Sequence, residues 1–438
     1  MINSKRQFLK QSFAVATTVG GAGSLSSALA GRAISKVVEP GTPDRGWTAS
    51  PSIIAKFEER AKRRDYKVIY HEEQIPTYSL PDPLLMNNGS KLADAEVWRK
   101  NHRPEILELF REHVFGRAPI GRPDGMTFAT GTVDPQVLQG AATVKNIVVN
   151  FTGESSGLRM DMRVYTPNKA TNPVPCFLYL GRPMPADSPL PSRLVEALQE
   201  IISRGYALAI IDRSALDGDE HDGFGNGVHG EFDPPGERTG EAWGTIAAWA
   251  WGLSRALDYL ETDKDVDAKR VAAMGVSLGG KTALWAGAQD ERFAMSISVC
   301  SGCTGAALSR RRFGEPVGAI NARFPNWFCE NYHKYNWQED ELPIDQHMLL
   351  SLIAPRLLYV SSADEDLWAD PRGEFLGAKH ANPVYELLGD PGLEADNMPA
   401  LESPVHAGRI GYHIRRGGHG LEHYDWLRYL DFADRHWR

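Results

Sequence analysis

The chain has 438 residues, of which 42% are hydrophobic and 24% charged. This composition is typical of a globular protein with room for one large domain or two medium ones. The formal net charge is −8, and no clustered basic stretch offers a footprint for nucleic acid. We therefore expect no nucleic-acid partner.

The first thirty residues have the features of an export signal. They carry three positive charges and no acid, then an apolar run of small residues from Phe13 that ends in Ala28-Leu29-Ala30. We predict a signal peptide over residues 1–30. The stretch SKRQFLK resembles a twin-arginine signal with Lys5 in place of the first arginine. Cleavage changes the formal net charge from −8 to −11.

The alternative for this segment is an N-terminal membrane anchor. The apolar run is short and rich in Gly, Ser and Thr, which favours a cleaved signal. No later apolar stretch is long enough to span a bilayer. We expect an exported, periplasmic or secreted, protein without stable membrane association.

Four cysteines remain in the mature chain: Cys176, Cys300, Cys303 and Cys329. An exported protein can oxidise them, and four cysteines allow three full pairings among which the sequence does not choose. Cys300-x-x-Cys303 lacks a second ligand pair of its kind, so the spacing does not indicate zinc. We expect no metal site.

The pattern along the chain changes near residue 120. Residues 31 to about 95 are punctuated by Pro and Gly and only weakly periodic, and residues 93–115 follow as a helical pattern with a Gly116 to Pro119 stop. We interpret residues 31–120 as an N-terminal extension packed on a catalytic domain of residues 121–438. That domain opens with two paired strands, 146–151 and 158–165.

From residue 174 onward, buried strands alternate with helices. Short apolar runs predict the strands, and apolar residues at helical spacing predict the helices. The strands are expected at 176–180, 207–212, 270–274, 294–299, 356–361 and 409–414, and the helices at 190–204, 245–260, 281–288 and 424–436. Such alternation implies a parallel sheet covered on both faces.

Gly275-Val276-Ser277-Leu278-Gly279 matches the pattern G-x-S-x-G between a predicted strand and a predicted helix. This context is that of the nucleophile elbow in the α/β-hydrolase fold, a three-layer αβα sandwich with a mostly parallel central sheet. The sharp turn favours glycine on both sides, because side chains there collide with the strand and the helix. The helix N-terminus places backbone N–H groups near a developing oxyanion. The alternative is a glycine-rich turn that only caps a helix.

Serine is a poor nucleophile without a base, and in this fold the acid and the histidine follow the serine in the chain. His419 lies in a loop between the last strand and the closing helix, where the fold presents its base. Three other histidines are rivals: His413, His423 and His436. They fall inside the strand or in and near the helix, so structural or surface roles suit them better.

The acidic member of the triad is expected after the strand at 356–361. Three carboxylates compete there: Asp364, Glu365 and Asp366. The acid must accept the imidazole N–H and stabilise the imidazolium. The sequence alone does not choose among them.

Several segments between Gly240 and Trp437 carry a more specific pattern. They are AWGTIAAWAWGLSRALDYLETD, MGVSLGGKTALWAGA, SGCTGAALSRRRFGE, INARFPNWFCENY, LPIDQHMLLSLIAPR, SADEDLWADPRGEF and GRIGYHIRRGGHGLEHYDW. With these segments the chain resembles the glucuronoyl esterases of carbohydrate esterase family 15. The resemblance implies cleavage of esters between (4-O-methyl)glucuronic acid on xylan and alcohols of lignin.

Carried over by this resemblance, Ser277 is the nucleophile and His419 the base. Lys281 matches a lysine that holds the sugar, although by itself it reads as a surface residue on the helix after the elbow. Glu315 in RRRFGE and Trp368 in EDLWADP match further uronate-contacting positions. A lysine and a carboxylate can bond ring hydroxyls, and an indole can cover the sugar.

Two positions depart from the family pattern. The family's usual arginine after the serine is Leu278 here, whose backbone N–H can still serve the oxyanion. The family's usual glutamate is Cys300, and a neutral thiol cannot partner an imidazolium. The acid must then come from the later loop, where alignment of EDLWADP favours Asp366. Cys300 is instead a candidate for a disulfide with Cys303 or Cys329.

The sequence thus predicts a monomeric serine esterase without cofactor. Its expected partner is glucuronoxylan or a lignin–carbohydrate ester. Two alternatives remain: another carbohydrate esterase of this fold, such as an acetyl xylan esterase, and a catalytically weak sugar-binding relative. The departures at Leu278 and Cys300 motivate the second alternative, while the retained serine, histidine and acidic loop argue against it.

Overall fold

The structure is a computed structural model that describes residues 46–86, 89–153, 157–181 and 190–438, and the backbone of 34–38. All of them belong to the unit of residues 33–438. The predicted signal peptide lies outside the described residues. Among the described residues, no helix is both long and apolar enough to cross a membrane.

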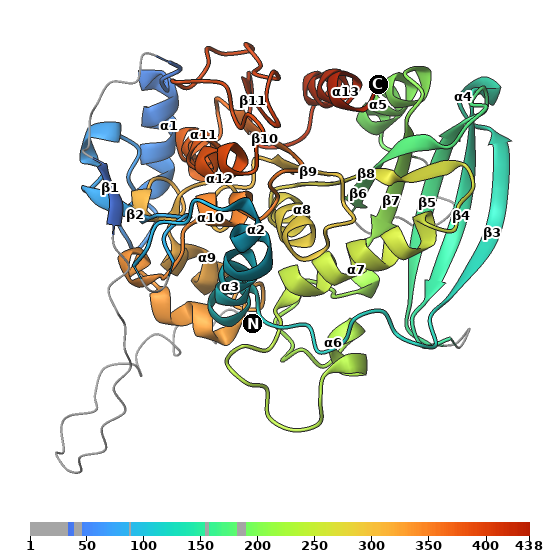
Figure 1. Ribbon diagram of the computed structural model, residues 1–438, viewed down its shortest axis with the longest axis horizontal. Coiled ribbons are helices and arrows are strands. Elements are labelled where there is room, and N and C mark those ends of the chain that lie inside the picture. Colours follow the sequence, from blue (N-terminus) through green and yellow to red (C-terminus); the bar gives the residue numbers. More distant parts are fainter. Residues whose placement is uncertain (1–33, 39–45, 87–88, 154–156, 182–189) are drawn as a thin grey trace. The chain divides into compact units, whose positions relative to one another are not determined.

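The unit is built on one large sheet, whose described strands follow the order β11-β10-β9-β8-β6-β7-β5-β4-β3 (Figure 1). The strands are β3 (Thr127–Gln136), β4 (Ala142–Asn150), β5 (Arg159–Pro167), β6 (Val174–Gly181), β7 (Ala207–Asp212), β8 (Val266–Val276), β9 (Met295–Val299), β10 (Leu357–Ala363) and β11 (Ile410–Arg415). A separate antiparallel pair joins β1 (Ile34–Val38) to β2 (Tyr78–Pro81).

The strands from β11 through β7 in this order pair in parallel, while β5, β4 and β3 are antiparallel to their neighbours. After β6 the chain runs to β7 on one side and then returns to β8 on the other, so the strand order reverses between β6 and β8. Ligands of open α/β sheets bind outside the carboxyl ends of the strands at such a reversal. The segments after β8, β9, β10 and β11 therefore meet at one edge.

The α-helices connect these strands and cover the sheet. They are α1 (Pro51–Ala61), α2 (Ala95–Val97), α3 (Arg103–Phe110), α4 (Val137–Gly140), α5 (Ser192–Ser203), α6 (Gly227–Phe232), α7 (Thr245–Leu260), α8 (Leu278–Gln289), α9 (Val317–Arg323), α10 (Gln346–Ser351), α11 (Pro371–His380), α12 (Asn382–Leu387) and α13 (His423–Trp437). Two π-helical segments, Trp98–His102 and Arg111–Phe115, flank α3.

Two hydrophobic cores lie on the two faces of the sheet. One contains the buried side chains of α3, α7, α8 and α10, and the other those of α5 and α13. Figure 1 shows α5 and α13 on one side of the strands and α7 and α8 on the other. The three-layer sandwich with a mostly parallel sheet is therefore confirmed, as expected where short strands are rich in apolar residues.

The predicted strands and helices from residue 146 onward are present, and most boundaries agree within a few residues. Several elements were not predicted, and α1 and β3 illustrate why. The extension contains α1, which Ser50 caps and Pro51 starts but which buries only Phe57, so its apolar pattern is weak. Strand β3 was missed because almost all of its residues are exposed, which removes the alternation that marks a half-buried strand.

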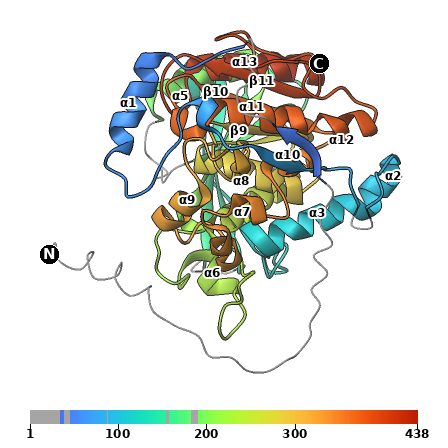
Figure 2. The same cartoon turned by 90° about the vertical axis from the view of Figure 1, so that its left-hand side faces the viewer.

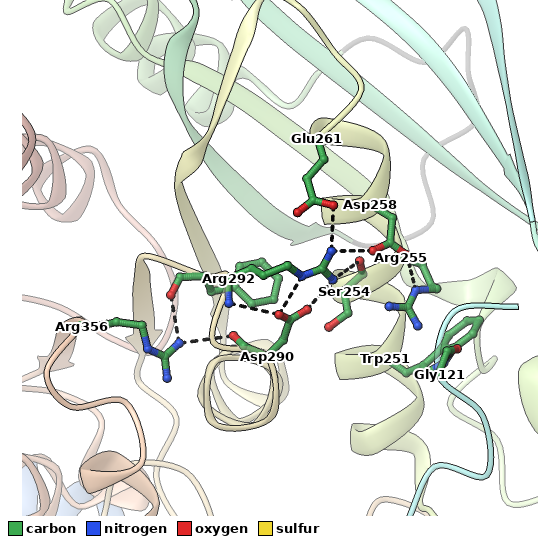
Figure 3. A network of polar contacts seen from close by, with 10 residues as sticks. Gly121, Trp251, Ser254, Arg255, Asp258, Glu261, Asp290, Arg292 and Arg356 are labelled. Carbon is green, nitrogen blue, oxygen red and sulfur yellow. Dashed lines mark hydrogen bonds and ion pairs between the residues drawn. The ribbon is translucent and has the colours of Figure 1, made fainter. Parts of the chain in front are cut away.

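A network of ion pairs fixes the end of α7 to the end of α8 (Figure 3). Arg292 donates to Asp258 at 2.7 Å, to Glu261 at 2.9 Å and to Asp290 at 2.7 Å. Arg255 donates its Nε–H to the other oxygen of Asp258 at 2.7 Å. Because several charges share partners here, the network stabilises the packing more than an isolated surface pair does.

Candidate active site

Ser277 sits in a strained turn between β8 and α8. Its backbone has φ 58° and ψ −118°, and its N–H donates to the carbonyl of Val299 at 2.8 Å. A positive φ is uncommon for a residue with a side chain, and it persists where the surroundings hold it. The elbow therefore holds the serine at the end of β8, at the carboxyl edge of the sheet.

The two glycines of the motif differ in what they meet. A Cβ on Gly275 would lie 2.5 Å from the backbone of Gly279, so β8 and α8 approach too closely for a side chain there. A Cβ on Gly279 would meet the side chain of Leu180 at 3.7 Å, an ordinary contact. The expected collision thus holds at Gly275 and is wrong at Gly279.

A short hydrogen bond joins His419 to Asp366. The imidazole Nδ1 lies 2.6 Å from the carboxylate Oδ2, with the Asp366 side chain 7% exposed and that of His419 47% exposed. An ionised carboxylate only accepts hydrogen bonds, so Nδ1–H is the donor and Nε2 is left to accept a proton. The hydrogen bond to Asp366 raises the pKa of His419 above its usual value, although burial opposes it.

Backbone hydrogen bonds join the loop after β10 to the loop after β11. The N–H of Asp364 donates to the carbonyl of Arg415 at 2.9 Å, and the N–H of Glu365 donates to the carbonyl of Gly417 at 3.0 Å. The Asp364 carboxylate accepts the N–H of Gly417 at 2.8 Å. Of the three candidate acids, Asp366 contacts the imidazole, while Asp364 fastens the loop that carries it.

The rival histidines have other positions. His413 is fully buried in β11, between the hydroxyl of Tyr359 at 3.0 Å and the carboxylate of Asp425 at 2.8 Å. His423 starts α13, and His436 lies near the end of that helix. None of the three lines the cavity that contains Ser277.

A cavity of about 500 Å³ opens over the serine. Its lining comes from α1, the elbow, and the loops after β9, β10 and β11: Lys56, Phe57, Arg60, Arg64, Ser277, Lys281, Cys300, Ser301, Gly302, Glu315, Arg323, Phe324, Trp327, Glu365, Asp366, Trp368, Ala369, Gly418 and His419. Ser277 Oγ makes no hydrogen bond to any described residue. In unliganded enzymes the hydrogen bonds between catalytic groups are often long, and they shorten when substrate binds.

Lys281 is buried, at 3% exposure, and is not a surface residue of α8. It lies one turn after Ser277, and its ammonium donates to the carbonyl of Ser301 and, at 2.6 Å, to that of Cys303. Burial lowers its pKa, while nearby Glu315 opposes that change. The ammonium therefore lies at the floor of the cavity, and two of its three hydrogens are used.

Glu315 and Trp368 are held together on one side of the cavity. The Glu315 N–H donates to the carbonyl of Trp368 at 3.0 Å, and the two side chains hydrogen-bond as well. Burial raises the pKa of Glu315, while Lys281 and the Trp368 bond act against it. The guanidinium of Arg64 stacks on the indole, with its central carbon 3.6 Å from the ring centroid.

The suggested disulfide of Cys300 with Cys303 or Cys329 is wrong. All four cysteines are buried free thiols. Burial in apolar surroundings raises the pKa of the Cys300 thiol, and the nearby Asp366 raises it further. Arg415 acts against this rise, but burial is the largest cause, so the thiol is neutral.

Cys300, Asp366 and His419 have possible metal-ligand atoms within 4.8 Å of one another. Two of these groups already share the 2.6 Å hydrogen bond, and the third is a thiol that burial keeps protonated. A metal ligand must be deprotonated. The arrangement is better suited to proton transfer than to holding an ion.

Two buried residues that support the site were not predicted. Glu374 of α11 accepts the N–H of Gly302 at 2.9 Å and the hydroxyl of Ser362 at 2.7 Å. Arg415 at the end of β11 donates to the carbonyl of Gly420 at 2.7 Å and to Asp425 at 2.8 Å, which fixes the loop of His419. Charged residues inside predicted buried elements are the signal that could have found them.

Leu278 is the first residue of α8. The first N–H groups of a helix have no earlier helical carbonyl to bond. The N–H groups of Gly280 and Lys281 donate to the carbonyl of Ser277, at 2.9 and 3.1 Å. The N–H of Leu278 lies next to the serine and can serve a developing oxyanion.

A second cavity, of about 430 Å³, lies between α7, the end of α8 and the segment after α3. Arginines line it, but Arg255 is paired with Asp258 and Arg117 with Glu241. No residue of the motif lines this cavity among the described residues.

Comparisons with known proteins identify the family of the chain. A family model described as "Glucuronyl esterase, fungi" matches residues 149–389. The carbohydrate esterase MZ0003, from an unknown prokaryotic organism, is 41% identical over 89% of this chain and 95% of its own length. A 4-O-methyl-glucuronoyl methylesterase from Phanerochaete carnosa is 28% identical over 71% of this chain and 73% of its own. A solved glucuronoyl esterase from Solibacter usitatus has 42% identity and a TM-score of 0.78, and covers 83% of this chain and 100% of that structure.

Proposed function

Because the chain belongs to the glucuronoyl esterases of carbohydrate esterase family 15, we propose that Ser277, His419 and Asp366 carry out its ester hydrolysis. The protein is a carboxylic ester hydrolase that acts on glucuronoyl esters. The observation that carries the residue assignment is the 2.6 Å bond between His419 and Asp366 in the cavity that opens over Ser277.

The reaction is a two-step acyl transfer. Ser277 Oγ attacks the ester carbonyl carbon, and its proton passes to Nε2 of His419. The tetrahedral intermediate collapses, and the alcohol leaves with that proton. Water then attacks the glucuronoyl-serine, with His419 again taking and returning a proton. Asp366 holds the imidazole in the correct tautomer and stabilises its positive charge.

The oxyanion is stabilised by backbone N–H at the start of α8. The N–H of Leu278 is one donor, and the positive end of the helix dipole adds to it. Lys281 places a buried positive charge at the floor of the same cavity. Its third hydrogen is available to a ring hydroxyl or to the ester group.

Lys281, Glu315 and Trp368 bind the uronate. They line one cavity with Ser277, and hydrogen bonds fix Glu315 to Trp368. A buried carboxylate and ammonium suit the hydroxyls of a sugar ring, because each hydroxyl both donates and accepts. The indole supplies a rigid apolar face that can cover the ring.

The natural substrate is an ester between (4-O-methyl)glucuronic acid on xylan and an alcohol of lignin. The name of the Phanerochaete carnosa relative supports the glucuronoyl part. The N-terminal residues 1–30 are a signal peptide, and the mature protein works as a periplasmic or secreted monomer without membrane association.

The test is hydrolysis of a benzyl glucuronate ester by the purified protein beside Ser277→Ala and His419→Ala. We expect turnover by the wild type and loss of at least about 10³-fold in kcat for both variants, as for an acyl-transfer triad. His423→Ala, which changes a histidine outside the cavity, is the matched control and should retain turnover. Labelling by a fluorophosphonate should require Ser277.

Turnover of acetylated xylan with none of the glucuronate ester would favour an acetyl esterase. Absence of both turnover and labelling would favour a sugar-binding relative. Equal activity of wild type and Ser277→Ala would overturn the assignment of the nucleophile.

A further inference from the structure

The acidic side chains that line the catalytic cavity have partners within the protein, whereas several of the basic ones form no close ion pair. Its lining contains three acidic side chains, and each has a partner. Asp366 binds His419, and Glu365 binds Lys56 at 3.0 Å. Glu315 is bonded to Trp368 and lies close to Lys281. The carboxylates of the cavity are therefore engaged within the protein.

Three arginines of the same lining form no close ion pair with an acid among the described residues: Arg60, Arg64 and Arg323. Arg64 and Arg323 still lie near enough to Glu315 for their charges to lower its pKa. Arg60 lies 5.2 Å from the ring of Phe57, and Arg323 lies 4.9 Å from the ring of Phe324. Arg64 stacks on Trp368 and donates to the hydroxyl of Tyr66 at 3.0 Å. Stacking uses the face of a guanidinium and leaves N–H groups at its edge to bind an anion.

These arginines come from two elements that reach the cavity mouth. Lys56 and Arg60 are one turn apart on α1, and Arg64 follows in the turn after that helix. Arg323 ends α9. Figure 2 shows α1 and α9 on the same side of the unit. Residues four apart share a helix face, so Lys56 and Arg60 lie on the face of α1 that lines the cavity, where Lys56 pairs with Glu365 and Arg60 does not.

The reacting group of the substrate does not explain this charge. A glucuronoyl ester is neutral, and its developing oxyanion is served at the start of α8. Exposed positive charges at a cavity mouth concentrate anions near it. Guanidinium groups match carboxylates because two parallel N–H bonds fit the two oxygens.

We propose that Arg60, Arg64 and Arg323 form a carboxylate-binding site at the mouth of the catalytic cavity, for the free carboxylate of a uronic acid. This inference rests on the proposed function. The carboxylate has two sources: the glucuronate that hydrolysis releases, or an unesterified uronate next to the ester on the same polysaccharide. The first makes the site a product site, and the second makes it a determinant of substrate choice.

The first experiment uses sodium glucuronate as an inhibitor of benzyl glucuronate hydrolysis. Glucuronate should inhibit the wild type competitively, and the inhibition constant should rise about 10-fold in Arg60→Gln/Arg323→Gln, as expected for loss of bonds to a charged group. Added salt should weaken inhibition of the wild type more than that of the variant. Uncharged glucuronamide should inhibit both equally.

Matched controls separate this effect from general damage. Arg63→Gln changes an exposed arginine next to Arg64 that does not line the cavity, and it should keep the wild-type inhibition constant. Arg60→Lys/Arg323→Lys retains the charge and should retain most of the affinity for glucuronate. Arg60 and Arg323 are exposed, and unchanged melting temperatures would show that the variants fold.

The second experiment compares two oligosaccharides that each carry one glucuronoyl ester. One also bears a free uronate, and in the other that uronate is reduced to a neutral sugar. If the arginines bind a free uronate of the polysaccharide, the wild type should have a higher kcat/KM for the oligosaccharide with the free uronate. The expected difference is about 5-fold to 10-fold, as for one or two charged hydrogen bonds. The Arg60→Gln/Arg323→Gln variant should lose the preference.

A positive result in either experiment supports the site and identifies the source of the carboxylate. The inference is overturned if the variant and the wild type share both the glucuronate inhibition constant and the substrate preference. That failure is distinct from failure of the proposed function, in which the wild type does not hydrolyse the benzyl ester faster than Ser277→Ala.

Discussion

The imidazole Nδ1 of His419 lies 2.6 Å from the carboxylate Oδ2 of Asp366, although 53 positions separate the two residues in the chain. Parallel pairing of β10 with β11 brings the loops after both strands to one edge, and backbone bonds between the loops fix their spacing. Asp364 is two positions earlier, but its carboxylate binds a backbone N–H of the second loop. The two aspartates therefore have separable roles.

Asp366→Asn should lower kcat by on the order of 10³–10⁴-fold, because an amide cannot stabilise the imidazolium and favours the wrong tautomer. Asp364→Asn should cost less than about 10-fold, because an amide oxygen can still accept the N–H of Gly417. Steady-state rates on a benzyl glucuronate ester measure both. Equal losses, or the reverse ranking, would contradict the assignment of Asp366.

The pH profile should report the His419–Asp366 bond. The hydrogen bond to Asp366 raises the pKa of His419 above 6.5, and the base must be neutral to accept the serine proton. Activity should therefore rise with pH, and the midpoint of the acidic limb of kcat/KM should lie above 6.5. In Asp366→Asn the residual activity should show a lower midpoint. A wild-type midpoint below pH 6.5 would contradict a raised pKa of His419.

A carboxylate at position 300 should replace part of the function of Asp366. The Cys300 sulfur and the nearest ligand atoms of Asp366 and His419 lie within 4.8 Å of one another. In the Asp366→Asn background, Cys300→Glu should raise kcat at least about 10-fold over Asp366→Asn alone, because an acid again faces the imidazolium. Cys300→Gln, which has the same shape without the charge, should give no recovery.

The fold and the position of Ser277 could be predicted because the sequence motif and the expected secondary structure agree around this residue. The pattern around Ser277 follows an apolar strand and precedes a helix, and the topology then limits where a base and an acid can lie. The buried strands are rich in apolar residues, which makes their positions predictable. Strand β3 is exposed and α1 buries little, so neither carries the periodicity on which such predictions depend.

The choice among acids and the surroundings of the site depend on contacts that no local pattern encodes. Asp364 and Asp366 have the same chemistry, and their orientation is set by one turn after β10. Lys281 looked like a surface residue because burial of a lysine depends on carbonyls 20 and 22 positions away. The free thiols could not be distinguished from paired ones without their positions in space.

Glu374 is a buried residue that supports the site and that was not predicted from the sequence. Its burial makes the free energy of unfolding depend on pH. Burial raises its pKa from 4.5 to about 7, although bonds from Gly302 and Ser362 oppose the change. The folded state then binds the proton more tightly than the unfolded state. The free energy of unfolding should fall as pH rises from about 4.5 through 7, by at most about 3 kcal/mol from this group.

Glu374→Gln removes this titration and can keep the bonds to Gly302 and Ser362. Its melting temperature should therefore change less between pH 5 and pH 8 than that of the wild type. Glu386→Gln changes an exposed glutamate of α12 and should keep the wild-type slope. Identical slopes for Glu374→Gln and the wild type would show that Glu374 does not titrate in this range.

The two glycines of the elbow should differ in their tolerance of a methyl group. Gly275→Ala places a Cβ 2.5 Å from the backbone of Gly279, and backbone cannot move aside as a flexible side chain can. Forced overlap in a packed region costs about 1–3 kcal/mol or more, so the melting temperature should fall by several degrees.

Gly279→Ala is the matched comparison, since the new Cβ meets Leu180 at 3.7 Å and lies in a helix that favours alanine. Its stability should equal or exceed that of the wild type in thermal melts. Similar losses in both variants would mean that β8 and α8 pack against each other symmetrically about Ser277, contrary to the close approach at Gly275.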